Sequence, residues 1–171
     1  MKHLTHEQIT NLIAAATSPR DRLLLTLCYE HGLRISEALA LTPARVQRDF
    51  LCTRPLKDGR TTTQRLSAST AQLWASVTAT LAPSALIFPF SRMWASVIFH
   101  RAAEAAGIQL APRQGIHTLR HSCAHRLLDT GAGLTVVQRK LGHRSLASTG
   151  VYLEADDAAV DHASAKAFSL A

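Results

Sequence analysis

Residues 116–143 read IHTLRHSCAHRLLDTGAGLTVVQRKLGH, and the spacing of the apolar side chains in this stretch predicts two consecutive helices. In the first, over about 118–130, apolar side chains recur every four residues and form a face that can pack on a core. These side chains belong to Leu119, Cys123 and Leu127. Gly131 and Gly133 end that helix, and a shorter one is expected at 134–141. The stretch therefore indicates a helical protein.

The remaining sequence continues the helical pattern with one interruption. The first helix begins with a capping box formed by Thr5 and Gln8. Caps, stop signals and apolar spacing predict helices at 5–16, 19–30, 36–41, 69–81, 91–106 and 157–168. Helical spacing disappears over 46–66, where the pair Asp58-Gly59 is typical of a β-hairpin turn. The expected fold class is mainly α (α+β), with a small antiparallel β-hairpin or sheet.

Composition narrows the class of protein. The chain has 171 residues, 47% of them hydrophobic, which suits a single domain over 1–171 with a buried core. No apolar run is long enough to cross a bilayer, and the N-terminus lacks the apolar core of a signal peptide. We therefore expect a cytoplasmic protein. The cysteines share no paired spacing, so thiols are expected, buried in the case of Cys28 and Cys123.

Four reactive side chains lie close together in the second half of the chain: His117, Arg120, His143 and Tyr152. His117 and Arg120 are three residues apart, so at the start of a helix they project from adjoining parts of one face. A phenol behind two imidazoles and a guanidinium indicates a nucleophile directed at a phosphodiester. Arg34, in HGLRISEALAL, would complete an anion site if the fold brought it to the same place.

The distribution of charge predicts a nucleic-acid partner. The net charge is +7 and the pI about 10.0, which favours binding to a polyanion such as double-stranded DNA. Six basic residues fall within 45–65 and six within 112–145, whereas the chain from residue 154 onward is mainly acidic. The basic side chains that we expect to contact DNA, beyond the anion site, are Arg113, Arg126, Arg139, Lys140 and Arg144.

Taken together, these motifs resemble the catalytic domain of the tyrosine recombinases, also called the phage integrase family. The resemblance extends from LTHEQITNLIAAA near the N-terminus to Tyr152. Its most specific parts are HGLRISEALAL, the stretch 116–143 and the interval of nine residues from His143 to Tyr152. Any one of these motifs can arise by chance, whereas all of them in the right order are a strong signal of the family. The resemblance implies a site-specific recombinase or integrase, a DNA strand transferase.

The family resemblance also implies a role for each matching residue. Arg34 and Arg120 would bind the non-bridging oxygens of the scissile phosphate, a task that suits the planar, permanently charged guanidinium. Tyr152 would attack the phosphorus and hold the DNA as a 3′-phosphotyrosyl intermediate. His117 and His143 would assist proton transfer and donate hydrogen bonds to the phosphate as negative charge builds.

Two further residues have supporting roles in this scheme. Lys57, at the predicted hairpin turn, would protonate the departing 5′-oxygen. Glu37 follows Arg34 by three residues and would orient a basic group through a charge-assisted hydrogen bond, without taking part in the chemistry. One phosphodiester is exchanged for another ester of similar energy, so no cofactor and no metal is expected, and the sequence has no phosphate-binding glycine loop.

Competing interpretations exist for several of these residues. Tyr152 has the alternative of an ordinary half-buried tyrosine, and Lys57 that of a surface lysine, since Arg60 and Arg65 lie nearby. The i, i+4, i+8 histidines at 117, 121 and 125 resemble zinc ligands, but no acidic residue is close by to support a metal.

Two other functions compete with the recombinase. LTVVQRKLGHRSLAST resembles a helix-turn-helix, which would make the protein a non-enzymatic DNA-binding regulator. That interpretation leaves Arg34, Arg120 and Tyr152 unexplained. A type IB topoisomerase would share the chemistry but relax supercoils without a defined site.

The ends of the chain raise the question of assembly. Members of the family carry an N-terminal domain that closes round the DNA, and we expect this domain to be absent here. The apolar stripe of the 157–168 helix, formed by Val160, Ala163, Ala167 and Phe168, is too small for a core of its own. The resemblance implies that this helix docks into a neighbouring subunit and links a tetramer on DNA. The alternative is that it packs on its own domain.

Overall fold

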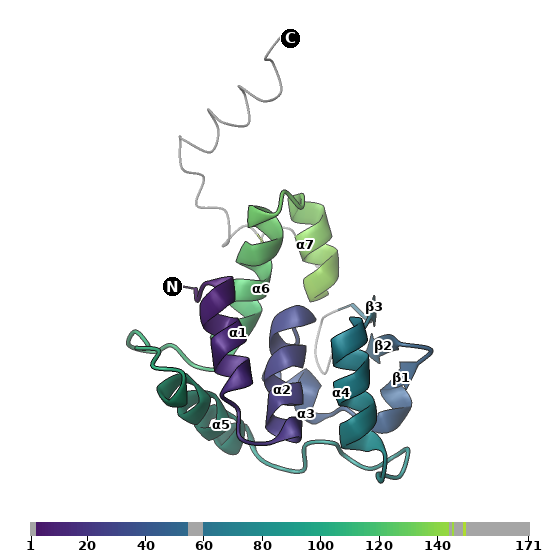
Figure 1. Cartoon of the computed structure of the whole chain (residues 1–171). Helices are drawn as coiled ribbons and strands as arrows, with labels where there is room; N and C mark the ends of the chain where they lie inside the picture. The colour runs from purple at the N-terminus through teal and green to yellow at the C-terminus, as the bar shows by residue number, and fades with distance from the viewer. Residues whose placement is uncertain (1–2, 55–59, 144, 146–148, 150–171) are drawn as a thin grey trace.

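The computed structural model describes residues 3–54, 60–143, 145 and 149, and its helices gather around one central helix, α2 (Figure 1). Within this part of the chain the elements are α1 (His6–Ala14), α2 (Pro19–Glu30), α3 (Ile35–Leu39), the 3-10 helix η1 (Pro43–Arg45), β1 (Val46–Gln47), β2 (Phe50–Thr53), β3 (Thr62–Arg65), α4 (Ala68–Thr78), α5 (Arg92–Ala105), α6 (His117–Asp129) and α7 (Leu134–Leu141). The mainly α fold with a small antiparallel sheet is confirmed.

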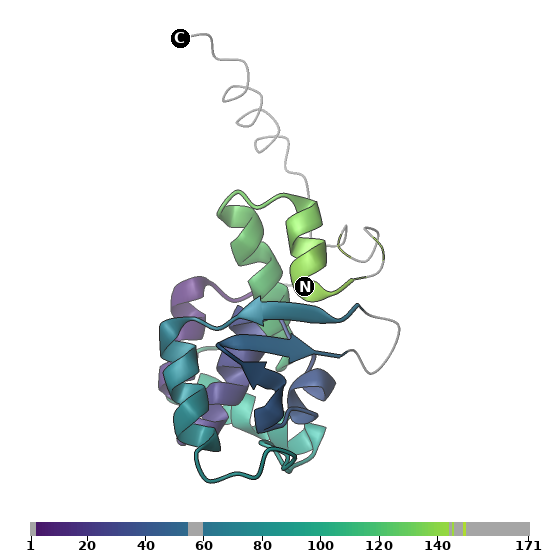
Figure 2. The same cartoon turned by 90° about the vertical axis from the view of Figure 1, so that its right-hand side faces the viewer.

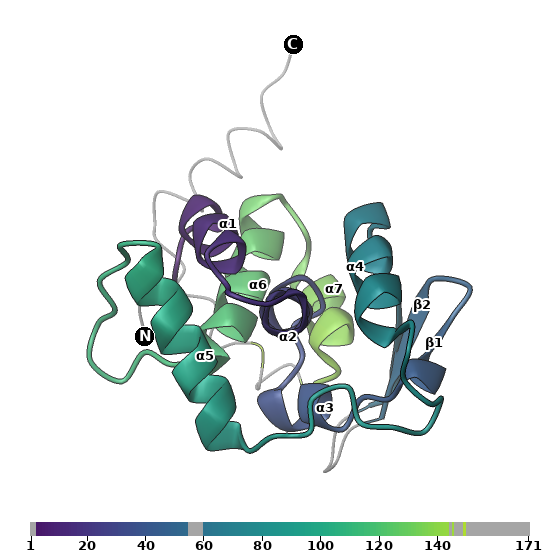
Figure 3. The same cartoon turned by 60° about the horizontal axis from the view of Figure 1, so that its bottom comes forward.

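Helix α2 forms the middle of the core. Ser18 caps it by accepting a hydrogen bond from the Asp21 N–H, and Pro19 occupies the first turn, where no backbone donor is needed. Every residue from 23 to 29 is buried, so this helix is surrounded by protein rather than amphipathic. Figure 3 shows α2 end-on among its neighbours, and it contacts α1, α3, α4 and α6.

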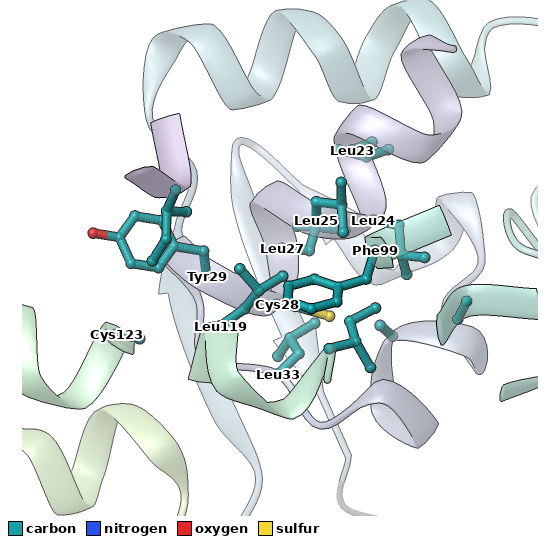
Figure 4. Close-up of a cluster of buried hydrophobic side chains, with 14 of the residues drawn as sticks. Leu23, Leu24, Leu25, Leu27, Cys28, Tyr29, Leu33, Phe99, Leu119 and Cys123 are labelled. Carbon is teal, nitrogen blue, oxygen red and sulfur yellow. The ribbon is translucent and has the colours of Figure 1, made fainter. Parts of the chain in front are cut away.

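The core joins α2 to helices from distant parts of the sequence. Leu119 of α6 and Phe99 of α5 are fully buried in the same cluster as Cys28 of α2 (Figure 4). Cys123 is also buried, so the expected burial of both thiols is confirmed. Burial raises the pKa of Cys28 to about 12 and that of Cys123 to about 11, which leaves both as unreactive thiols.

The sheet has one hairpin more than the sequence predicts. Its strands are ordered β1-β2-β3 and are all antiparallel (Figure 2). The turn between β1 and β2 is made by Arg48 and Asp49, both with positive φ, 47° and 64°. Neither residue is a glycine, so the turn lacks the usual sequence signal. The predicted turn at Asp58-Gly59 lies outside the described residues, but β2 and β3 on either side of it pair as expected.

Helices α6 and α7 follow the prediction closely. The predicted range 118–130 becomes His117–Asp129, and 134–141 is reproduced. Gly142 ends α7 in the left-handed conformation, with φ 66°. The expected helix over 157–168 lies outside the described residues. Among the helices that the structure describes, none is long and apolar enough to span a membrane.

Candidate active site

The turn after α2 presents Arg34 at the start of α3. Gly32 has φ +60°, and a β-carbon there would collide with the Leu141 side chain, so the turn requires glycine. Arg34 caps α3: its backbone N–H donates to Glu37 Oε2 and its Nη1 donates to Glu37 Oε1, both at 2.9 Å. The Arg34 side chain remains 44% exposed, whereas Glu37 is buried. A buried carboxylate therefore holds a solvent-facing guanidinium in place.

Arg120 reaches the same carboxylate from α6. Its residue exposure is only 8%, and its Nη1 lies 3.8 Å from Glu37 Oε2. Nη1 also donates to the carbonyl of Gly32, and Nη2 donates to the carbonyl of Leu141 at 2.8 Å. Since these carbonyls lie at the C-terminal ends of α2 and α7, a cation between them is favoured by both helix dipoles. The fold thus brings Arg34, Glu37 and Arg120 together.

His143 adds a neutral imidazole to this group. It directly follows Gly142 and is buried, and its Nδ1 lies 2.9 Å from the Thr149 hydroxyl. Burial, followed by the positive charges of Arg120 and Arg34, lowers the pKa of His143 to about 4. His143 is therefore uncharged at pH 7 and lies within the electrostatic field of both arginines.

His117 lies one turn before Arg120, at the exposed start of α6. Its ring meets that of His121 edge to face, with centroids 5.8 Å apart. Burial, and then the charge of His117, lowers the pKa of His121. His125, the last of the three histidines, instead stacks on His3 with centroids 4.0 Å apart. Across the part of the chain that the structure describes, no group of three or more His, Cys, Asp or Glu residues could hold a metal ion.

The basic residues that we expected to contact DNA are placed differently from one another. Arg113, Arg126 and Arg139 are exposed. Lys140 is half-buried, and burial lowers its pKa. Lys140 and Arg139 line a groove of about 860 Å³ between β3 and α7, together with Arg60, Arg65 and His143. The groove is thus a basic surface that ends at the candidate site.

Two buried polar residues behind Arg120 were missed by the sequence analysis. His31 directly precedes Gly32 and is 2% exposed. Its Nδ1 lies 3.1 Å from Oε1 of Gln64 on β3. Burial, and then the charge of Lys140, lowers the pKa of His31 to about 4, while its hydrogen bond to Gln64 acts in the opposite direction. For Gln64, the only available signal was a polar residue at an inward position of β3, and alternation alone does not distinguish such a residue from a solvent-facing one.

Several of the predicted residues have no position to report. Lys57, Arg144 and Tyr152 lie outside the described residues, as does the 157–168 segment. Of the predicted site residues, the structure brings Arg34, Glu37, Arg120 and His143 together.

Comparison with known proteins decides the family. The model of the phage integrase family matches residues 2–159. The chain belongs to the phage integrase family. Among curated relatives, it is 32% identical to the tyrosine recombinase XerD of Neisseria meningitidis and 35% identical to the tyrosine recombinase XerC of Mycobacterium leprae. Both alignments cover 87% of this chain and 57% of the relative.

The fold of this phage integrase family member also matches solved structures. It superposes on the crystal structure of XerA recombinase with a TM-score of 0.82 at 20% identity, covering 100% of this chain and 66% of that one. The catalytic domain of bacteriophage HP1 integrase gives a TM-score of 0.71 at 25% identity, covering 99% of this chain and 95% of that domain. The chain spans 51 to 62% of the length of the first curated relatives that it matches.

Proposed function

We propose that this chain is the catalytic domain of a site-specific DNA recombinase, spanning residues 1–171, that cleaves and rejoins DNA through a 3′-phosphotyrosyl intermediate. The observation that carries the proposal is the sharing of one buried carboxylate, Glu37, by Arg34 and Arg120, which lie far apart in the sequence. Beside them lies the neutral His143. Such a set suits the binding of a phosphodiester, because two guanidinium groups can donate to its non-bridging oxygens.

Preorganisation of the two arginines is the main catalytic contribution of this site. Arg34 is held by two hydrogen bonds to Glu37, and Arg120 by two backbone carbonyls, so neither has to reorganise when charge builds on the phosphate. A neutral His143 can donate a hydrogen bond to a phosphate oxygen and can also accept a proton, whereas an imidazolium can donate but cannot accept. His117 would assist from the exposed start of α6.

For the nucleophile and the general acid, the proposal is supported by family membership. Tyr152 would attack the phosphorus, and Lys57 would protonate the 5′-oxygen that leaves. The phosphotyrosyl ester keeps the energy of the broken bond, so the reverse attack by a 5′-hydroxyl reseals DNA without a cofactor. The proposed pocket supplies the positive charge that a phenol needs to react near neutral pH.

Double-stranded DNA is the proposed partner. Solved structures with this fold include XerH recombinase bound to its difH substrate, at a TM-score of 0.77, and a lambda integrase dimer bound to a core site, at 0.73. In this chain, the groove between β3 and α7 brings Arg60, Arg65, Arg139 and Lys140 to the edge of the site. We assign DNA contacts to Arg139 and Lys140, and also to Arg113, Arg126 and Arg144, which would bind sequence-independently through phosphates.

The Tyr152→Phe variant tests the chemistry. Wild type incubated with nicked duplexes of random sequence is expected to leave a fraction of the DNA covalently bound on a denaturing gel. Tyr152→Phe should lose this adduct completely while binding DNA with unchanged affinity, because only the attacking hydroxyl is removed. If wild type and variant bind equally and neither forms an adduct, the protein is a DNA-binding regulator. Supercoil relaxation without a defined site would instead indicate a topoisomerase.

We also propose that the protein works as a tetramer on DNA, linked by the 157–168 helix. Support comes from the apolar stripe of that segment and from family membership. Removing residues 157–171 is then expected to spare covalent cleavage of single sites and to abolish strand exchange between two sites. Strand exchange at the wild-type rate by the truncated chain, measured on paired synthetic sites, would contradict the proposal and favour packing of the helix in cis.

A further inference from the structure

Gln64 and Arg120 both bind backbone carbonyls at the ends of α2 and α7, and each carbonyl bound by Gln64 directly precedes one bound by Arg120. Arg120 donates to the carbonyls of Gly32 and Leu141. The Gln64 side-chain amide donates to the carbonyls of His31, at 3.2 Å, and Lys140, at 2.9 Å. The two side chains therefore bind consecutive carbonyls on the same two segments, although one comes from β3 and the other from α6.

These contacts determine which way the Gln64 amide faces. Two carbonyl oxygens lie next to its Nε2, and a carbonyl accepts but never donates, so the nitrogen must face them. The oxygen, Oε1, then faces His31 Nδ1 at 3.1 Å and can only accept. His31 Nδ1 must therefore carry the proton. Since the pKa of His31 is lowered to about 4, its imidazole is neutral at pH 7, with the proton on Nδ1 alone.

The same group faces a small shared space. A cavity of about 10 Å³, the size of one water molecule, lies between His31, Gln64 and Arg120. Among the described residues, His31 Nε2 has no hydrogen-bond partner. The charged side chains around this cavity are Glu37 of α3, Arg60 before β3, Arg120 of α6 and Lys140 of α7. His31, Gln64 and Arg120 thus form one contiguous cluster behind the surface that would bind phosphate.

We propose that Gln64 is a positioning residue for Arg120, and that His31 keeps the Gln64 amide in the orientation that holds both helix ends. The inference rests on the proposed function for its consequence in catalysis. Removing the amide takes away one of the two side chains that donate to carbonyls of both segments, so the guanidinium can shift with either helix. Displacements of about 1 Å at a reacting centre cost on the order of 100-fold in rate.

Two substitutions of Gln64 test this role. Gln64→Leu removes both donors, and Gln64→Glu replaces them with a carboxylate that faces two carbonyl oxygens. Each is expected to slow adduct formation on saturating nicked duplex about 10- to 100-fold at pH 8 with little change in the Kd for DNA, as for the loss of other outer-shell partners. In Gln64→Glu, the rate relative to wild type should rise as the pH falls toward 5, because the protonated carboxyl regains one donor. Gln64→Leu should show no such recovery.

The matched control is Thr70→Val. Thr70 is buried and polar like Gln64, but its hydroxyl donates to Glu30 of α2 at 2.6 Å, and neither residue lines the cavity beside Arg120. It should lose stability while forming the adduct at the wild-type rate. If both Gln64 variants also cleave at the wild-type rate below their unfolding temperature, Gln64 is only structural and the proposal fails.

A measurement without DNA separates this proposal from the recombinase assignment. Nitrogen NMR of the histidine side chains should show His31 protonated on Nδ1 and unprotonated on Nε2 in wild type, and a changed signal in Gln64→Leu. The opposite tautomer in wild type would overturn the pairing, even in an active recombinase. The expected tautomer in a protein that forms no adduct with DNA would support the pairing and contradict the recombinase function instead.

Discussion

Arg120→Ala is expected to lower the free energy of unfolding by about 3 kcal/mol and to abolish detectable adduct formation with DNA. The stability loss follows from burial: the substitution leaves the carbonyls of Gly32 and Leu141 without the guanidinium that donates to both. Glu37 keeps its contacts with Arg34 but loses the second positive charge. Denaturant unfolding followed by circular dichroism measures the first effect.

The catalytic effect is expected to exceed the structural one. Loss of one preorganised donor to a developing charge slows reactions about 10²- to 10³-fold, and Arg120 also holds two segments of the site. Arg120→Lys preserves the charge but cannot reach two carbonyls and a phosphate with one ammonium group, so it should fold better than the alanine variant and still cleave at least about 10²-fold slower.

The stability control for this prediction is Arg126→Ala. Arg126 lies on the same helix but is exposed, so its replacement should change the free energy of unfolding by less than about 0.5 kcal/mol. Equal destabilisation by the two alanine variants would show that the buried contacts of Arg120 do not stabilise the fold.

Acid is expected to destabilise the folded protein strongly between pH 6.5 and 4. His31 and His143 have folded-state pKa values of about 4, whereas a histidine in the unfolded chain has its ordinary pKa of 6.5. Across this range the unfolded chain binds more protons than the folded one, so lowering the pH favours unfolding. The stabilisation is complete above about pH 6.5 and is lost as the pH falls to about 4. For His31, which is 2% exposed, a shift of this size corresponds to roughly 3 kcal/mol.

The histidine contribution can be isolated by difference. His31→Asn should reduce the slope of unfolding free energy against pH between 6.5 and 5, above the range where most carboxylates titrate. His100→Asn, at an exposed position of α5, serves as the control and should leave the slope unchanged. If His31→Asn leaves the slope unchanged, the His31 imidazole binds a proton equally well in the folded and the unfolded state, which contradicts the prediction.

Much of the fold could be predicted because its signals are local. The helices from α1 to α7 were located within a few residues by caps, glycine stops and apolar spacing, since these features act within one or two turns of the chain. The β1–β2 hairpin was missed because Arg48 and Asp49 adopt positive φ without the glycine or asparagine that normally announces such a turn. Contacts of the strands with the rest of the protein compensate for that local cost.

The candidate site divides in the same way. The order of the motifs was enough to identify Arg34, Glu37, Arg120 and His143 as site residues, and from it we predicted that they lie together in one site. Their geometry depends on tertiary contacts: Arg120 and Gly32 are 88 residues apart in sequence, and Gln64 and Lys140 are 76 apart. Nothing in the sequence predicts such pairs, since a side chain on a strand has no preference for a particular distant carbonyl.

Periodicity and motif order are properties of the linear chain, so they were enough to predict the helices, the family and the residues able to bind a phosphodiester. They could not predict that Glu37 contacts two arginines, that His143 is buried and neutral, or that His31 and Gln64 lie behind Arg120. These properties arise from burial and from hydrogen bonds between distant segments, and neither exists until the chain has folded.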